Sequence, residues 1–118
     1  ALSEACRAHH VQVRDYTVAP DFSEEAQVGR HHWLIEFEQN PADSEAFCQT
    51  LDLALKKANA DYDAKRKGNI NIGFPLLTLA SNGTFHCWLK QKGKLGGQHK
   101  IPRLQNTPKL LQEILSCQ

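Results

Sequence analysis

The fold is decided by the stretch Arg30-His31-His32-Trp33-Leu34-Ile35-Glu36-Phe37-Glu38-Gln39 and by the Asn40-Pro41 pair that follows it. Successive side chains of a strand point to opposite faces, so this stretch predicts a strand with Trp33, Ile35 and Phe37 on one face. The other face would carry His32, Leu34, Glu36 and Glu38. Asn40-Pro41 ends the strand, and a proline suits the first turn of a helix. A strand that leads directly into a helix is therefore the centre of the predicted fold.

A long helix is predicted for residues 42–60. Its apolar side chains recur at helical spacing on one stripe, and polar side chains fall largely away from that stripe. The stripe holds Phe47, Leu51, Leu55 and Ala58, and the polar side includes Asp43, Gln49, Asp52 and Lys56. Residues 59–67 either continue this helix or form a second short helix, which Gly68-Asn69 ends. The apolar stripe is expected to pack on the strand.

The chain before Arg30 predicts a short helix and another strand. Residues 2–10 are helix formers, with the least polar ones at helical spacing. Residues 11–19 follow as a strand, in which Val11 and Val13 alternate with Gln12 and Arg14. Residues 20–29 are polar and acidic, which is typical of a loop.

The chain after residue 70 predicts a hairpin and a last helix. Asn82-Gly83 readily adopts the positive φ angles of a tight hairpin turn, which would join strands at 76–80 and 84–90. The second strand would place Cys87 on its core face, together with Phe85 and Leu89. Thr107-Pro108 is expected to cap the last helix, whose apolar stripe is Leu110, Leu111, Ile114 and Leu115.

This order of elements (helix, two strands, helix, two strands, helix) predicts a two-layer α+β domain. Four mainly antiparallel strands would be flanked by helices. The 118 residues suffice for one modest core, so residues 1–118 are expected to form a single domain. No apolar run reaches the roughly 18 to 20 residues that cross a bilayer, and the first residues lack the features of a signal peptide.

The net charge of +1 conceals an uneven distribution. Residues 1–63 hold twelve acidic and five basic side chains, whereas residues 64–118 hold nine basic side chains and one acidic side chain, Glu113. Either the two halves face each other in the fold, or the second half presents a basic surface to an anionic ligand or partner.

Cysteine and histidine spacing argues against two kinds of site. The four cysteines are widely spaced and form no C-x-x-C, so reduced structural thiols in a cytoplasmic or other reducing intracellular compartment are expected. Four of the six histidines form adjacent pairs, whose side chains diverge on a strand or a helix, and no metal site is predicted. Phosphate-binding loops and a nucleophile elbow are absent from the sequence.

One basic, glycine-rich segment stands out, Gly93-Lys-Leu-Gly-Gly-Gln-His-Lys-Ile-Pro-Arg103. Glycine lets a ligand approach the main chain, while lysine and arginine are the usual partners of phosphate and carboxylate groups. The segment is either an anion-binding loop or a solvated connector. Nucleic acid is a weaker alternative and is not the expected partner, because the pI is near 7.9 and the first half is acidic.

Three segments resemble, in register, a known family. They are Asn59-Ala-Asp-Tyr62-Asp-Ala-Lys-Arg66, Gly83-Thr84-Phe85 and Gly97-Gln98-His99-Lys100-Ile101-Pro102-Arg103. They look like landmarks in the small carboxy-terminal domain of the auxin-responsive Gretchen Hagen acyl-acid amido synthetases, and the spacing is similar to that of an animal homologue, the Gretchen Hagen domain-containing protein. Nearly the whole chain is covered. The sequence has His99 and Ile101 where plant members tend to have Tyr and Thr.

The resemblance implies a part of an adenylate-forming enzyme. In such enzymes an amino-terminal adenylation domain binds ATP, with Mg²⁺, and a small acyl acid. The carboxy-terminal domain closes over them as a mobile lid, and an amino acid then attacks the acyl-adenylate to give an amide. Residues 1–118 would be this lid, which alone would catalyse nothing.

The same resemblance assigns roles to individual residues. Lys100 would be the catalytic contact to the ATP phosphates, and Arg103 and Gln98 would support it there. The glycines would act as hinges of the loop, at Gly93, Gly96 and Gly97. Tyr62 and Arg66 are expected to be structural or to lie at the domain interface. The alternative is a catalytically inactive family member whose domain serves as a protein-interaction module.

Overall fold

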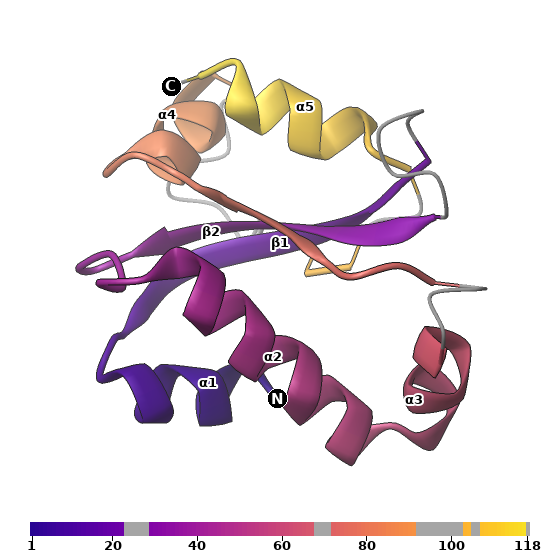
Figure 1. The fold of residues 1–118 in the computed structure, drawn as a ribbon. Helices are drawn as coiled ribbons and strands as arrows, with labels where there is room; N and C mark the ends of the chain where they lie inside the picture. Colours follow the sequence, from indigo (N-terminus) through magenta and orange to yellow (C-terminus); the bar gives the residue numbers. More distant parts are fainter. Residues whose placement is uncertain (23–28, 68–71, 92–102, 105–106, 118) are drawn as a thin grey trace.

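The structure is a computed structural model that describes residues 1–22, 29–67, 72–91, 103–104 and 107–117. Helices and strands follow one another in an order close to the predicted one up to residue 79 (Figure 1). The elements are α1 (Leu2–His9), β1 (Val13–Asp21), β2 (Arg30–Phe37), α2 (Ser44–Ala58), α3 (Ala60–Arg66), β3 (Leu76–Leu79), α4 (Thr84–Gln91) and α5 (Lys109–Leu115). The α+β class is confirmed.

The described strands form one sheet in the order β1-β2-β3. β1 and β2 are antiparallel, with Tyr16 opposite Ile35 and Val18 opposite Trp33. β3 runs parallel to β2, with Trp33 opposite Leu77. The predicted strand at 76–80 is therefore confirmed, but it pairs in parallel with the central strand and is not the first half of a hairpin.

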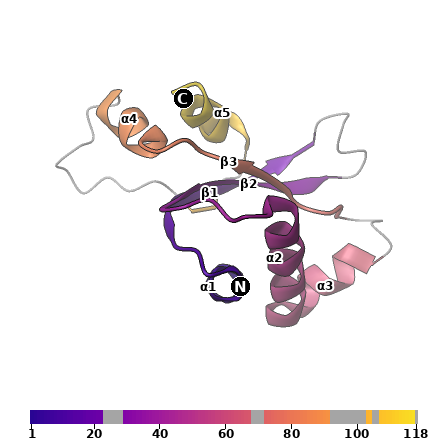
Figure 2. The ribbon, with the colours of Figure 1, turned by 60° about the vertical axis from the view of Figure 1, so that its left-hand side comes forward.

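Helices cover both faces of the sheet, so the prediction of two layers is wrong. α1, α2 and α3 lie on one side of the sheet and α4 and α5 on the other (Figures 1 and 2). β2 supplies buried side chains to both sides. Trp33, Ile35 and Phe37 pack with Phe47 and Leu51 of α2, as their predicted common face requires. Leu34 packs on the other side, in a cluster with Phe85, Trp88, Leu111 and Ile114.

The predicted fourth strand, residues 84–90, is also wrong, because these residues form helix α4. The reason lies on β2, far away in the sequence. The carboxylate of Glu36 is 2% exposed and accepts hydrogen bonds from the backbone N–H groups of Gly83 (3.2 Å) and Phe85 (3.2 Å). A carboxylate at these unpaired amides stabilises the start of a helix. Gly83 does adopt a positive φ of 89°, but the turn leads into a helix.

Local caps explain where the two central helices begin. The Asp43 side chain accepts a hydrogen bond from the Ala46 N–H at the start of α2. The Asn59 side chain accepts from the N–H groups of Asp61 and Tyr62. Asn59 therefore ends α2 and begins α3, which confirms the alternative of a second short helix.

Candidate functional site

Most of the predicted loop lies outside the described residues. This applies to Lys100 and Gln98, and to Gly93, Gly96 and Gly97. Arg103, at the end of the loop, is described. The Val18 N–H donates to the Arg103 carbonyl at 2.8 Å, and Val18 and Leu104 form a parallel β-bridge. Arg103 and Leu104 thus lie along the edge of β1 that does not pair with β2.

The Arg103 side chain makes three contacts with residues of β1. Its Nη1 forms an ion pair with Asp15 Oδ1 and donates to the Tyr16 carbonyl at 2.9 Å. Its guanidinium carbon lies 4.5 Å from the centre of the Tyr16 ring, which is a cation–π contact. Arg103 nevertheless stays 54% exposed. A held but exposed arginine suits the binding of an anion.

Two hollows lie beside Arg103 and Tyr16, which contribute to the walls of both. The larger, of about 500 Å³, lies between α1 and the first residues of β1 and includes Cys6, Arg14 and Asp15 in its lining. The smaller, of about 250 Å³, is mostly apolar and is lined by Val18, His31, Trp33, Leu55 and Leu104. Arg103 is thus a cation placed between a hollow of mixed polar and apolar lining and a mostly apolar one.

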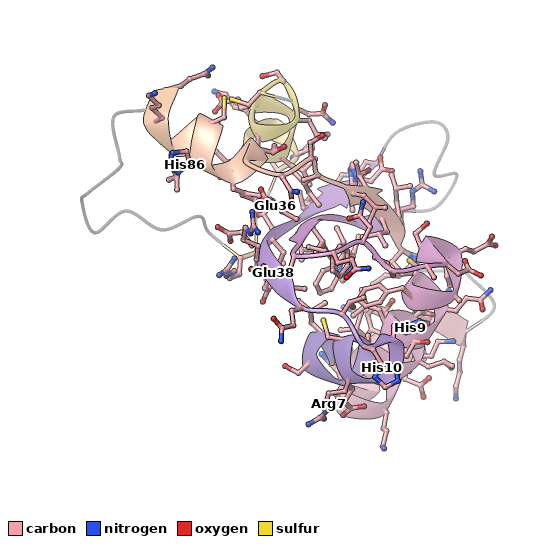
Figure 3. The ribbon with its side chains drawn as sticks, turned by 90° about the vertical axis from the view of Figure 1, so that its left-hand side faces the viewer. Arg7, His9, His10, Glu36, Glu38 and His86 are labelled. Atoms are coloured by element: carbon pink, nitrogen blue, oxygen red, sulfur yellow. The ribbon has the colours of Figure 1, made fainter. Side chains whose placement is uncertain are left out.

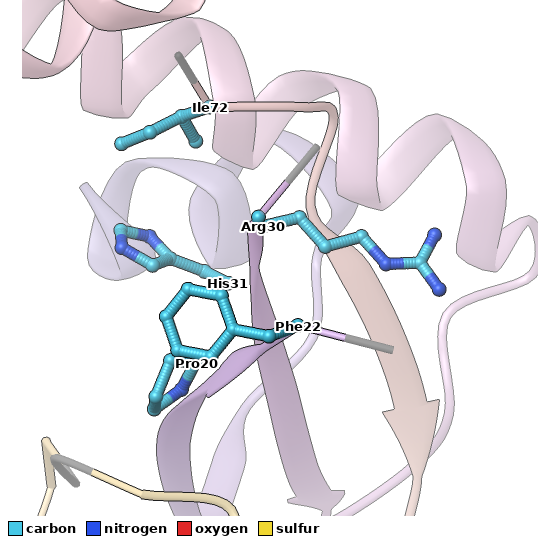
Figure 4. A pocket seen from close by; sticks show the side chains of 6 residues that line it. Pro20, Phe22, Arg30, His31 and Ile72 are labelled. Carbon is cyan, nitrogen blue, oxygen red and sulfur yellow. The ribbon is translucent and has the colours of Figure 1, made fainter. Parts of the chain in front are cut away.

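A third hollow of about 150 Å³ lies at the far end of β1 (Figure 4). The side chains of Pro20, Phe22 and His31 gather there, while the Arg30 side chain points away from them. Arg30 Nε donates to Asp21 Oδ2 at 2.8 Å. Phe22 is 77% exposed. His31 of β2 lines both this hollow and the mostly apolar one.

Tyr62 and Arg66 are buried and bind the same carboxylate. The Asp52 Oδ1 atom accepts from the Tyr62 hydroxyl at 2.6 Å and from Arg66 Nε at 2.8 Å. Arg66 Nη2 donates to Asp52 Oδ2 at 2.8 Å, and Lys56 Nζ lies 3.5 Å from the same oxygen. The His31 ring stacks on Tyr62, with a centroid distance of 5.7 Å. These contacts lock α2 to α3, while a role at a domain interface stays a prediction.

Asp52 had been expected on the polar side of the helix, and that expectation is wrong, because Asp52 is buried. Burial raises the pKa of Asp52, but hydrogen bonds from Arg66 and Tyr62 outweigh burial and hold that pKa below its usual range. Burial and the Asp52 carboxylate together raise the pKa of Tyr62. Asp52 lies one helical turn after Cys48, which is also buried, so this side of α2 is covered in the structure.

The thiols and imidazoles add no metal site among the residues described. Within that part of the chain, no group of three or more His, Cys, Asp or Glu side chains is placed to hold a metal ion. All four cysteines are free thiols. Cys87 lies on helix α4 and is half-buried, not on the core face of a strand. Burial raises the pKa of Cys48 to about 11, so that thiol is protonated at neutral pH.

None of the described helices is long and apolar enough to cross a membrane.

Comparisons with known proteins agree with this fold. Residues 1–109 match the GH3 family C-terminal domain. A solved structure of a "GH3.15 acyl acid amido synthetase" superimposes with a TM-score of 0.73 at 23% identity, over 98% of this chain and 22% of that one. Another, "AtGH3.15 acyl acid amido synthetase in complex with 2,4-DB", gives 0.71 at 21% identity, over 98% and 21%. None of the curated sequences compared matches the chain significantly.

The match covers most of the chain, whereas the chain spans only about a fifth of the solved proteins that it resembles. The matched residues include the three landmark segments, Arg103 and the helices α1 to α4. α5 begins where the match ends. The chain belongs to the GH3 family, and it corresponds to the carboxy-terminal domain of that family.

Proposed function

We propose that residues 1–118 are the mobile lid of an acyl-adenylate-forming acid–amino acid amido synthetase. The observation that carries this proposal is the family match over residues 1–109. In the full-length protein, an amino-terminal adenylation domain would bind ATP, as its Mg²⁺ complex, and the acyl acid. The domain described here would then close over them, and an amino acid would receive the acyl group.

Lys100 is the residue proposed to touch the ATP phosphates. Formation of an acyl-adenylate breaks the bond between the α- and β-phosphates, and negative charge develops on the departing pyrophosphate. An ammonium group placed there stabilises the transition state more than the bound substrates, which is the condition for a faster reaction. Gln98 and Arg103 would support this contact, and Gly93, Gly96 and Gly97 would let the loop change shape on closure.

The anchored position of Arg103 supports this proposal. Lys100 precedes Arg103 by three residues, so fastening Arg103 to β1 limits how far Lys100 reaches from the sheet. A closed lid would also exclude water, which otherwise hydrolyses an acyl-adenylate. Under this proposal the domain contributes the Lys100 ammonium group and shields the acyl-adenylate from water. The remainder of the active site belongs to the proposed partner domain.

The test compares the intact full-length protein with a version that lacks residues 1–118. Exchange of labelled pyrophosphate into ATP is measured with a panel of small carboxylic acids. The proposal predicts acid-dependent exchange by the intact protein and a loss of at least about 100-fold on removal of the domain, because the phosphate contact and the cover are lost together.

The alternative function, a protein-interaction module in an inactive family member, predicts a different outcome. The intact protein would then show no exchange with any acid, and no binding of ATP. Exchange that is equal with and without the domain would contradict the lid role but not the adenylation chemistry.

A further inference from the structure

Arg103 is held by one nitrogen only. Nη1 makes both of its hydrogen bonds, to the Asp15 carboxylate and to the Tyr16 carbonyl. Among the residues that the structure describes, nothing bonds to Arg103 Nε or Nη2. These two nitrogens form one edge of the planar guanidinium group, and their N–H bonds point in nearly parallel directions. One side of the guanidinium group is therefore bonded to β1, and the other side bonds to none of the described residues.

Two other arginines in this chain show what that edge binds. Arg66 uses Nε and Nη2 to hold both oxygens of Asp52, at 2.8 Å each. Arg14 uses the same two nitrogens for Glu38, at 3.4 and 3.2 Å. In both cases the edge meets a pair of oxygens on one oxyanion, which is the bidentate geometry of arginine with carboxylate or phosphate. Arg103 has the same edge without a described partner.

A stack with two aromatic rings, Tyr16 and Trp33, limits the movement of the Arg103 guanidinium group. The guanidinium lies on the Tyr16 ring, and that ring stacks on Trp33 with a centroid distance of 5.8 Å and an angle of 24°. Trp33 is buried on the central strand. The stack thus connects the exposed arginine to the core of the sheet. A side chain supported in this way loses little further rotational freedom when it binds a ligand.

We propose that Asp15 and Tyr16 are positioning residues, which hold Arg103 through Nη1 and the ring face so that its Nε–Nη2 edge receives an oxyanion in a bidentate manner. The oxyanion is a phosphate group or a carboxylate. Under the proposed function, on which the choice of ligand rests, these are a phosphate of ATP or the carboxylate of an acid substrate. The two hollows beside Arg103 give such a ligand room on either side.

The direction in which Asp15→Ala changes the affinity for the anion separates this proposal from a general charge effect. Asp15→Ala removes a negative charge next to the anion, and long-range electrostatics alone would make anion binding tighter. The positioning role predicts the opposite, because Arg103 loses its tether. We expect the dissociation constant to rise about 10-fold for Asp15→Ala and for Tyr16→Leu. Tyr16→Phe keeps the ring and the backbone carbonyl and is expected to bind like the wild type.

The experiment titrates the full-length protein calorimetrically with ATP, with inorganic pyrophosphate and with benzoate. Arg103→Leu reports whether Arg103 binds any of them, and Asp61→Asn, on the exposed face of α3, is the matched control. The probe whose binding weakens identifies phosphate or carboxylate as the ligand. Equilibrium unfolding of each variant shows that it is folded.

The outcomes for this proposal and for the proposed function are distinct. Binding of ATP that Arg103→Leu leaves unchanged overturns the inference and leaves the proposed function standing. Binding of benzoate that depends on Arg103, without any binding of ATP, supports the inference and removes the ATP-dependent function. Wild-type or tighter binding by Asp15→Ala and Tyr16→Leu overturns the positioning role, as does a wild type that binds none of the three probes.

Discussion

At the scale of single residues, the most strongly constrained group is the Asp52 carboxylate. It is buried, and it accepts hydrogen bonds from one tyrosine and one arginine of the next helix. Breaking such a buried pair is costly, because the remaining charge stays desolvated. Tyr62 and Arg66 were singled out from the sequence, but their shared partner was not. A helical wheel places Asp52 beside the apolar stripe, and only the position of α3 decides that this side is covered.

Removal of the Tyr62 hydroxyl tests the energetic weight of this group. Tyr62→Phe keeps the ring stacked near His31 but deletes a 2.6 Å hydrogen bond to a carboxylate. A hydrogen bond to a charged group contributes about 2 kcal/mol, so the free energy of unfolding is expected to fall by that amount. The measurement is denaturant unfolding at pH 7. Tyr16→Phe, at the chain's other tyrosine, is the control and should stay within about 0.5 kcal/mol of the wild type.

The acid side of the stability curve provides a second prediction at this scale. The pKa of Asp52 lies below its usual value in the folded chain, so its contribution is complete above the usual pKa of about 4 and is lost as the pH falls through the folded-state pKa. The wild type should therefore be more stable than Asp52→Asn at pH 6, and the difference should shrink below about pH 4. A stability difference that is constant from pH 6 to pH 2.5 would contradict the ionised buried pair.

At the scale of elements, α4 shows where prediction from the sequence ends. The segment from Thr84 to Gln91 has β-type residues and follows an Asn-Gly pair, both of which favour a hairpin. It becomes a helix because its N-terminus meets the Glu36 carboxylate and its apolar side meets α5 over the sheet. Figure 3 shows Glu36 on the sheet close to α4, and His86 on that helix. Both contacts join residues far apart in the chain, which local patterns do not contain.

The elements with their own local signals were predictable. The first two strands, the long helix and the last helix each carry a clear periodicity, and Asn59 and Asp43 are recognisable caps. In the candidate site, Arg103 was expected from the sequence, whereas its partners Asp15 and Tyr16 were not. They lie 88 and 87 residues earlier in the chain, and a long-range contact, the β-bridge between Val18 and Leu104, brings the two segments together.

A substitution at Glu36 that removes the charge and conserves the size of the side chain tests the account of α4. Glu36→Gln keeps the size of the side chain but weakens two hydrogen bonds to the start of the helix. We expect the free energy of unfolding to fall by about 1 to 2 kcal/mol, and the amides of residues 84–91 to exchange faster with deuterium than in the wild type. Glu38→Gln is the matched control, because Glu38 is about half exposed and pairs only with Arg14 among the described residues. Equal exchange in both variants would contradict the capping role.

At the scale of the whole molecule, the uneven charge of the two halves is partly accounted for. The ion pairs of Arg66 with Asp52 and of Arg103 with Asp15 each join a basic residue of the second half to an acidic residue of the first. A third such pair, Lys65 with Asp61, lies within α3. Among the described residues, the alternative that the halves face each other is thus realised at these pairs. The proposed anion site is compatible with these ion pairs, because the Nε–Nη2 edge of Arg103 bonds to no residue in the described part of the chain. Lys100 lies outside the described residues, and its role stays a prediction.

The central claim is that this domain brings Lys100 to the phosphates of ATP, and the most direct measurement is the rate of ATP–pyrophosphate exchange by full-length Lys100→Ala. The exchange rate is expected to fall by about 100- to 1,000-fold, because a contact made to developing negative charge is lost. Lys94→Ala, in the same basic segment, is the control and should retain most of the wild-type rate. An exchange rate for Lys100→Ala equal to that of the wild type would contradict the claim.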